Sequence, residues 1–127
     1  MSEKIKFEQE FIIKASSKML YNYISTPSAM SEWFAEDVNL KDGIFTFSWD
    51  GAEEQAKVIS KVKGKCIRFR WLEEEDDEAY VELKIETDEL TKEVALIVTD
   101  FAYEDELEEA KMLWESQISD LHHVIGV

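Results

Sequence analysis

The chain has 127 residues, of which 45% are hydrophobic and 12% aromatic, so it can form one hydrophobic core and is too apolar for a disordered acidic segment. Its 29 acidic and 14 basic residues give a formal net charge of −15, which repels the phosphates of nucleic acids and anionic membranes. No run approaches the roughly 20 apolar residues of a membrane span, and the first four residues lack the apolar core of a signal peptide. We therefore expect a single domain over residues 1–127, located in the cytoplasm, with no nucleic-acid partner and no membrane span.

The first third of the chain predicts one strand followed by two short helices. In residues 5–13 apolar and charged side chains alternate, which is the period of a strand with one face in water. The serine pair 16–17 can cap a first helix that ends before Pro27, the only proline of the chain. Pro27 suits the first turn of a second helix over 28–34, which would carry Met30, Trp33 and Phe34 toward the interior.

The middle of the chain has the period of strands, with turn residues at hairpin spacing. Asp42-Gly43 and Asp50-Gly51 are hairpin signals. The acidic run 73–78 lacks the carboxylate spacing of a calcium-binding loop and is interpreted as a solvated turn. The expected strands cover residues 38–40, 44–49, 55–62, 66–72, 79–87 and 94–101.

The C-terminal stretch 104–126 predicts a long amphipathic helix. Its apolar residues recur at three- and four-residue steps and therefore share one face. After so many antiparallel strands, such a helix covers the curved sheet that they form. We predict an α+β helix-grip fold, with a curved antiparallel sheet of six or seven strands around the helix and a cavity between them. The apolar stripe consists of Leu107, Ala110, Trp114, Ile118, Leu121 and Ile125.

Residues 15–34, with a first helix and then a Pro-led second helix ending in Trp33, resemble the START-like superfamily, as does the acidic hairpin that leads into an aromatic strand over 37–49. Within it the chain resembles the family of the activator of the 90-kDa heat-shock-protein ATPase. The resemblance covers nearly the whole chain and implies the same fold and cavity, on a frame that hosts lipid carriers, polyketide cyclases, hormone receptors and cochaperone domains. A compact bacterial START-like subgroup of unassigned activity is similar in segments 69–71, 98–101 and 114–118.

The expected ligand is an apolar or amphipathic small molecule, lipid-like or aromatic, held between the helix and the sheet. Small-molecule sites are mostly apolar, with a few polar groups that fix the orientation of the ligand. Core packing accounts for most of the aromatic residues, and a cavity lined by several of them is the alternative. The predicted lining residues are Trp33, Phe47, Trp71, Trp114, Ile118 and Leu121.

Four polar residues are candidates for the same cavity, each with a structural alternative. Arg68 and Arg70 share one face of a strand. Facing inward they would bind a carboxylate or phosphate; facing outward, which we favour, they pair with surface carboxylates. Asp100 interrupts an apolar strand and is either a turn or cap residue, as we favour, or a catalytic carboxylate. His122 lies either at the cavity mouth or, as we favour, at an exposed helix end.

The sequence contains no motif of a catalytic, metal or cofactor site. Adjacent His122 and His123 point about 100° apart on a helix, so they cannot form the i, i+4 pair of a helical metal site. There is also no nucleophile elbow and no phosphate-binding glycine loop. We expect no metal and no cofactor, and favour a non-enzymatic domain over a cyclase or hydrolase that uses Asp100 or His122. The alternative from another class is a protein-binding module whose acidic surface meets a basic partner protein.

Overall fold

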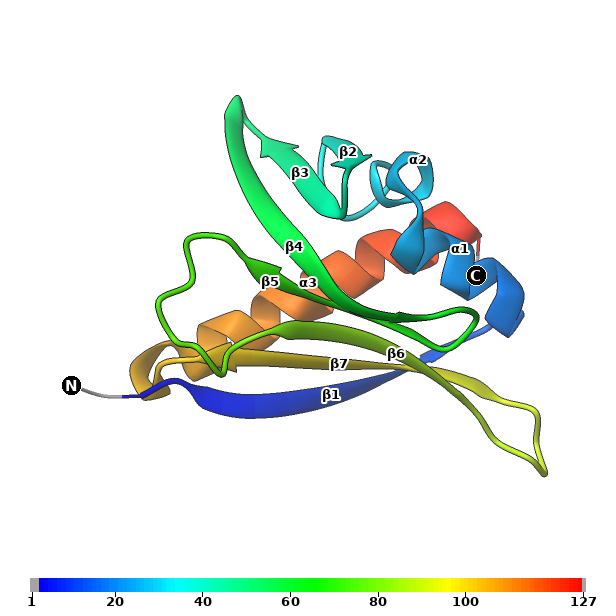
Figure 1. Ribbon diagram of the computed structural model, residues 1–127. Coiled ribbons are helices and arrows are strands. Elements are labelled where there is room, and N and C mark those ends of the chain that lie inside the picture. The colour runs from blue at the N-terminus through cyan, green and yellow to red at the C-terminus, as the bar shows by residue number, and fades with distance from the viewer. Residues whose placement is uncertain (1–2, 127) are drawn as a thin grey trace.

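The computed structural model describes residues 3–126, so Met1, Ser2 and Val127 of the expected domain lie outside the described residues, as do two of the four residues behind the signal-peptide prediction. Seven strands form one antiparallel sheet in the order β1-β7-β6-β5-β4-β3-β2. The long helix α3 runs along one face of this sheet and ends beside α1 and α2 (Figure 1). The predicted α+β helix-grip fold is therefore confirmed. The strands are β1 (Ile5–Ile13), β2 (Asp37–Lys41), β3 (Ile44–Trp49), β4 (Ala52–Val62), β5 (Cys66–Trp71), β6 (Val81–Thr87) and β7 (Val94–Ala102).

The long C-terminal helix has the predicted buried face. It begins with the short 3-10 helix η1 (Glu104–Glu106) and continues as α3 (Leu107–Ile125). The buried residues of α3 are Trp114, Ile118 and Leu121, which belong to the apolar stripe. Within residues 3–126, no helix combines the length and the apolarity that crossing a bilayer requires.

The first helix, α1 (Ser17–Ser25), is capped by Ser16, whose hydroxyl accepts a hydrogen bond from the amide of Met19 at 3.1 Å. After Thr26 the chain enters α2 (Pro27–Met30), with Pro27 in its first turn as expected.

The second helix is shorter than predicted, because residues 31–34 form a turn instead of continuing the helix. In this turn the indole Nε1 of Trp33 donates to the carbonyl of Tyr23 at 2.8 Å. Phe34 is 3% exposed and packs into the interior. Tertiary packing of two aromatic side chains therefore outweighs the helical preference of this segment.

The acidic run between β5 and β6 is mostly exposed, as expected of a solvated turn, but Glu74 and Asp76 are partly buried. The Glu74 carboxylate accepts from the Lys4 amine at 2.7 Å, and its side chain is 9% exposed. The turn also extends further than predicted, because β6 begins at Val81 and not at residue 79.

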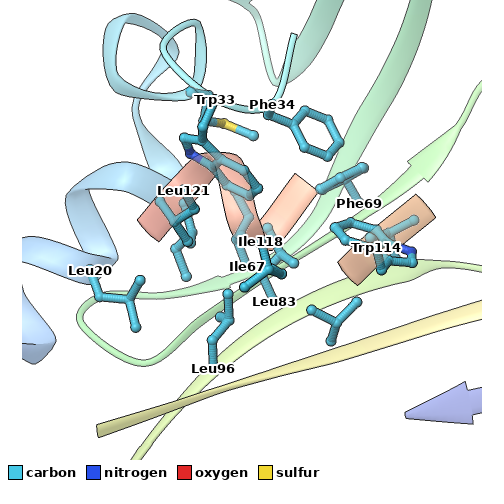
Figure 2. Close-up of a cluster of buried hydrophobic side chains, with 14 of the residues drawn as sticks. Leu20, Trp33, Phe34, Ile67, Phe69, Leu83, Leu96, Trp114, Ile118 and Leu121 are labelled. Carbon is cyan, nitrogen blue, oxygen red and sulfur yellow. The ribbon is translucent and has the colours of Figure 1, made fainter. Parts of the chain in front are cut away.

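The space between α3 and the sheet is filled by side chains. Phe45, Phe47 and Phe69 on the concave face are each fully buried. The ring of Phe34 lies among them, with its centroid 4.9 Å from Phe47 and 5.9 Å from Trp114. Figure 2 shows Phe34, Phe69 and Trp114 gathered at this point, and the aliphatic side chains of the sheet beyond them. Open space remains at the rim of the helix–sheet interface, where this packing ends.

Candidate functional site

An open groove lies at the rim, between the middle of α3 and residues of strands β3 to β7. Its volume is about 410 Å³. Four of its nine lining residues are aromatic, which makes its surface mainly apolar. We call it the aromatic groove; it is lined by Phe34, Trp49, Glu54, Trp71, Val81, Asp100, Leu113, Trp114 and Gln117.

Strand alternation explains the position of Trp49 and Trp71. Each is the last residue of a strand whose buried phenylalanines lie two positions earlier, so it points to the same concave face. At the strand end the covering helix recedes, and each indole is only partly buried. The indole Nε1 of Trp49 donates to the carbonyl of Phe34 at 3.0 Å, which fixes the ring. The centroids of the Trp49 and Trp71 rings are 6.3 Å apart.

Asp100 is the carboxylate at the inner wall of the aromatic groove. In β7 it follows the inward series Val94, Leu96 and Val98, so it points toward α3. Its Oδ2 accepts from the Trp114 indole Nε1 at 2.8 Å, and its Oδ1 accepts from the backbone amide of Phe101 at 2.7 Å. Because β7 continues past it to Ala102, Asp100 is not a turn residue, which corrects that expectation.

The electrostatic setting of Asp100 is a competition between burial and hydrogen bonding. Burial raises the pKa of Asp100 above its ordinary value, although the hydrogen bonds from Trp114 and Phe101 oppose this rise. The nearby Lys4 amine is bound to Glu74 and forms no described ion pair with Asp100. Among residues 3–126, no cationic side chain pairs directly with this carboxylate; the charge of Lys4 lowers the pKa of Asp100 from a distance, and that of Glu74 raises it.

A second pocket adjoins the aromatic groove at the C-terminal half of α3. It has a volume of about 590 Å³ and shares Phe34, Trp49, Leu113 and Gln117 with the groove. Its other lining residues are more polar than those of the groove and come from the turn after α2 and from α3. They are Ser31, Glu32, Trp33, Ala35, Glu36, Ser116, Asp120, His123 and Val124.

Five of the six predicted lining residues are buried, and Trp71 is partly exposed. Trp71 and Trp114 line the aromatic groove, and Trp33 lines the second pocket. The other three line neither pocket and are buried behind them, namely Phe47, Ile118 and Leu121.

Sequence reasoning missed two of the aromatic lining residues, Phe34 and Trp49. The signal for Trp49 was its alternation with Phe47 in one strand, which places both on the same face. The inward direction of Phe34 was predicted and is confirmed, but its place in the wall of the groove had no signal, because it depends on where α2 ends.

The two arginines lie on the outer face of the sheet, which confirms the favoured prediction that they face outward. Arg68 Nε donates to the Glu82 carboxylate at 2.9 Å, and its guanidinium lies 3.9 Å from the centre of the Tyr80 ring. Arg70 donates to two backbone carbonyls of the acidic run. Neither arginine lines the two pockets, so the inward alternative is wrong.

His122 also lies away from both pockets. Its Nε2 is 3.2 Å from the carbonyl oxygen of Ile12, at the contact of α3 with β1. Across residues 3–126, no group of three or more His, Cys, Asp or Glu side chains is arranged to hold a metal ion. The chemistry that the groove offers is therefore apolar contact together with hydrogen-bond acceptance by carboxylates.

Comparison with known proteins supplies a family and a set of similar structures. A family model for the START-like superfamily domain matches residues 1–127. The solution structure of BfR322 from Bacteroides fragilis is 34% identical, with a TM-score of 0.69, and the match covers 98% of this chain and 93% of that one. Among curated proteins, none matches the sequence.

Two more distant structures share the fold. The Aha1 dimer from Colwellia psychrerythraea is 16% identical, with a TM-score of 0.78 and 93% of each chain covered. CalU16 from Micromonospora echinospora is 14% identical, with a TM-score of 0.72, and the match covers 98% of this chain and 83% of that one. At these identities the likeness concerns the architecture alone.

Proposed function

The chain belongs to the START-like superfamily, and from this membership we propose that it binds an apolar or amphipathic small molecule in the aromatic groove. The observation that carries the proposal is the group of four aromatic side chains around an open groove of about 410 Å³. Ligand sites are typically apolar concavities of roughly 300 to 1,000 Å³ with a few convergent polar groups. The groove has this character, with Asp100, Glu54 and Gln117 as its polar groups.

The packed interior limits where such a ligand lies. The deeper space is occupied by buried phenylalanines, so the ligand contacts the rim and not the centre of the helix–sheet interface. In this arrangement Trp71 and Trp114 contact the ligand, whereas Phe47, Ile118 and Leu121 support the wall from behind. A binding role requires no nucleophile, metal or cofactor, and we propose a binding protein and not an enzyme.

The proposal is tested by native mass spectrometry of freshly purified protein, followed by organic extraction and identification of any bound molecule. We expect a stoichiometric ligand, and we expect Trp71→Ala to weaken its rebinding about tenfold or more, since a large aromatic contact is lost. Tyr80→Ala is the matched control, because it removes an aromatic side chain from the outer face. Protein that is empty, and whose melting temperature no apolar or amphipathic probe raises, would contradict the proposal.

A second candidate function is recognition of a basic protein segment by the outer face of α3. Met112 and Leu113 are 66% and 61% exposed, and acidic residues flank them on the same helix. We expect a defined amphipathic basic peptide to bind there, with an affinity that falls between about 0.05 and 0.3 M salt. Met112→Lys should abolish this binding; binding that is insensitive to salt and to this substitution would remove the candidate.

A further inference from the structure

The charged residues that line the aromatic groove are all acidic. Asp100 and Glu54 are its charged residues, and its nine lining residues, all described by the structure, include no lysine, arginine or histidine. The adjoining pocket adds the acidic residues Glu32, Glu36 and Asp120, and one histidine, His123. The groove thus lies in a negative local field on a chain whose formal net charge is −15, and such a field concentrates cations.

The Asp100 carboxylate has unused capacity to accept hydrogen bonds. It accepts two, from Trp114 and from the Phe101 amide, whereas two carboxylate oxygens offer about four acceptor sites. Within residues 3–126 no cationic side chain forms an ion pair with it, and the amine of Lys4 is bound to Glu74. A partly buried negative charge that forms no ion pair is costly, and a cation in the groove would relieve that cost.

The aromatic walls favour the same kind of ligand. Ring centroids are 5.8 Å apart for Phe34 and Trp49, 6.3 Å for Trp49 and Trp71, and 5.9 Å for Phe34 and Trp114. The indole N–H groups of Trp49 and Trp114 are both engaged within the protein, so these two rings are held in fixed orientations. The faces of aromatic rings attract ammonium groups, most strongly when water is excluded.

We propose that the ligand of the aromatic groove is an organic cation, a small molecule with an ammonium head and an apolar body. This inference rests on the proposed function and names its ligand class. The head contacts the aromatic walls near Asp100 and Glu54, and the apolar body lies against Val81 and Leu113. Fatty acids and phosphate-bearing lipids are disfavoured, because Arg68 and Arg70, which could have bound their anionic heads, face the opposite side of the sheet.

The test compares three phenyl-bearing probes of different charge: benzyltrimethylammonium, benzyl alcohol and phenylacetate. Binding is measured by isothermal titration and by tryptophan fluorescence at neutral pH and near-physiological salt. We expect benzyltrimethylammonium to bind about tenfold or more tightly than benzyl alcohol, with phenylacetate the weakest.

Charge-removing variants locate the effect. Asp100→Asn and Glu54→Gln should each weaken binding of the ammonium probe by about three- to tenfold, and should weaken binding of the uncharged benzyl alcohol by a clearly smaller factor. Glu8→Gln is the matched control, because it removes one carboxylate from the exposed face of β1 and should have no effect. If Asp100→Asn does not fold, the test uses Glu54→Gln and Trp49→Leu, each of which should weaken binding of the ammonium probe.

The outcomes separate this inference from the proposed function. Equal affinity for the three probes, or tighter binding of phenylacetate, overturns the cation inference and leaves ligand binding in the groove standing. An effect of Glu8→Gln as large as that of Glu54→Gln assigns the preference to the general field of the protein and also overturns it. If none of the probes binds, the cation inference fails, and the co-purified molecule decides the proposed function separately.

Discussion

Phe34→Ala is expected to lower the free energy of unfolding by about 3 to 5 kcal/mol, the usual range for removing a buried phenylalanine. Phe34 is 3% exposed, and its ring contacts aromatic rings from the sheet and from α3. The Phe34 side chain extends from the turn after α2 into the space between the sheet and α3. A smaller residue at this position leaves a cavity that the closely packed neighbours cannot fill. The effect should therefore lie in the upper part of this range.

Urea denaturation followed by circular dichroism measures this loss, with an unchanged m-value as the sign that both end states are preserved. Leu90→Ala is the control, since Leu90 is 93% exposed and its truncation should change stability by no more than about 0.5 kcal/mol. A loss below about 1 kcal/mol for Phe34→Ala would show that the turn after α2 collapses freely, and that Phe34 is not an anchor of the helix–sheet interface.

The fold could be predicted from the sequence because its elements depend on local periods. The alternation in residues 5–13 and 44–49 coincides with β1 and β3 residue for residue. The three- and four-residue steps of the last helix identified its buried face, including Trp114 and Ile118. Such periods state which face of an element is apolar, and a helix and a sheet with one apolar face each have few ways to pack.

The groove was less predictable from the sequence. The spacing of apolar residues shows which face of a strand they share, but not how deeply each of them is buried. Phe47 and Trp49 share one face of β3, yet Phe47 is fully buried and Trp49 borders the groove. The difference comes from how far α3 and the turn after α2 extend over the strand, which is a tertiary property. The partner of Asp100 was hidden for the same reason, since Trp114 meets it only through the register of helix against sheet.

Trp114→Phe is expected to cost about 2 to 4 kcal/mol of stability at neutral pH. Roughly 1.5 to 3 kcal/mol of this comes from the hydrogen bond that the indole donates to the charged Asp100 carboxylate, which spans 2.8 Å. The remainder comes from the smaller apolar surface of phenylalanine. Phenylalanine keeps most of the packing against the core, so the variant isolates the loss of the donor.

The cost of Trp114→Phe should depend on pH, with a sign that follows from the pKa of Asp100. Burial raises this pKa in the folded protein, so Asp100 favours folding most below its unfolded value of about 3.9. That contribution is lost as pH rises through the folded pKa. The Trp114 hydrogen bond opposes the rise in pKa, and its removal raises the pKa further and enlarges the loss. The stability difference between wild type and variant should therefore grow as pH rises above about 4 and become constant once the pH exceeds the pKa of Asp100 in the folded variant.

Urea denaturation of both proteins between about pH 4 and 7 measures this difference, and the same comparison in an Asp100→Asn background supplies the control. Without a carboxylate at position 100, the pH-dependent part of the difference should vanish and only the packing loss should remain, because Lys4 and Glu74 are the same in every variant. A difference that is constant with pH in the wild-type background would mean that Trp114 acts only by packing. The charged form of Asp100 would then be stabilised by water. Water would also screen this negative charge, so that it would attract a cationic ligand in the aromatic groove less strongly than the cation inference requires.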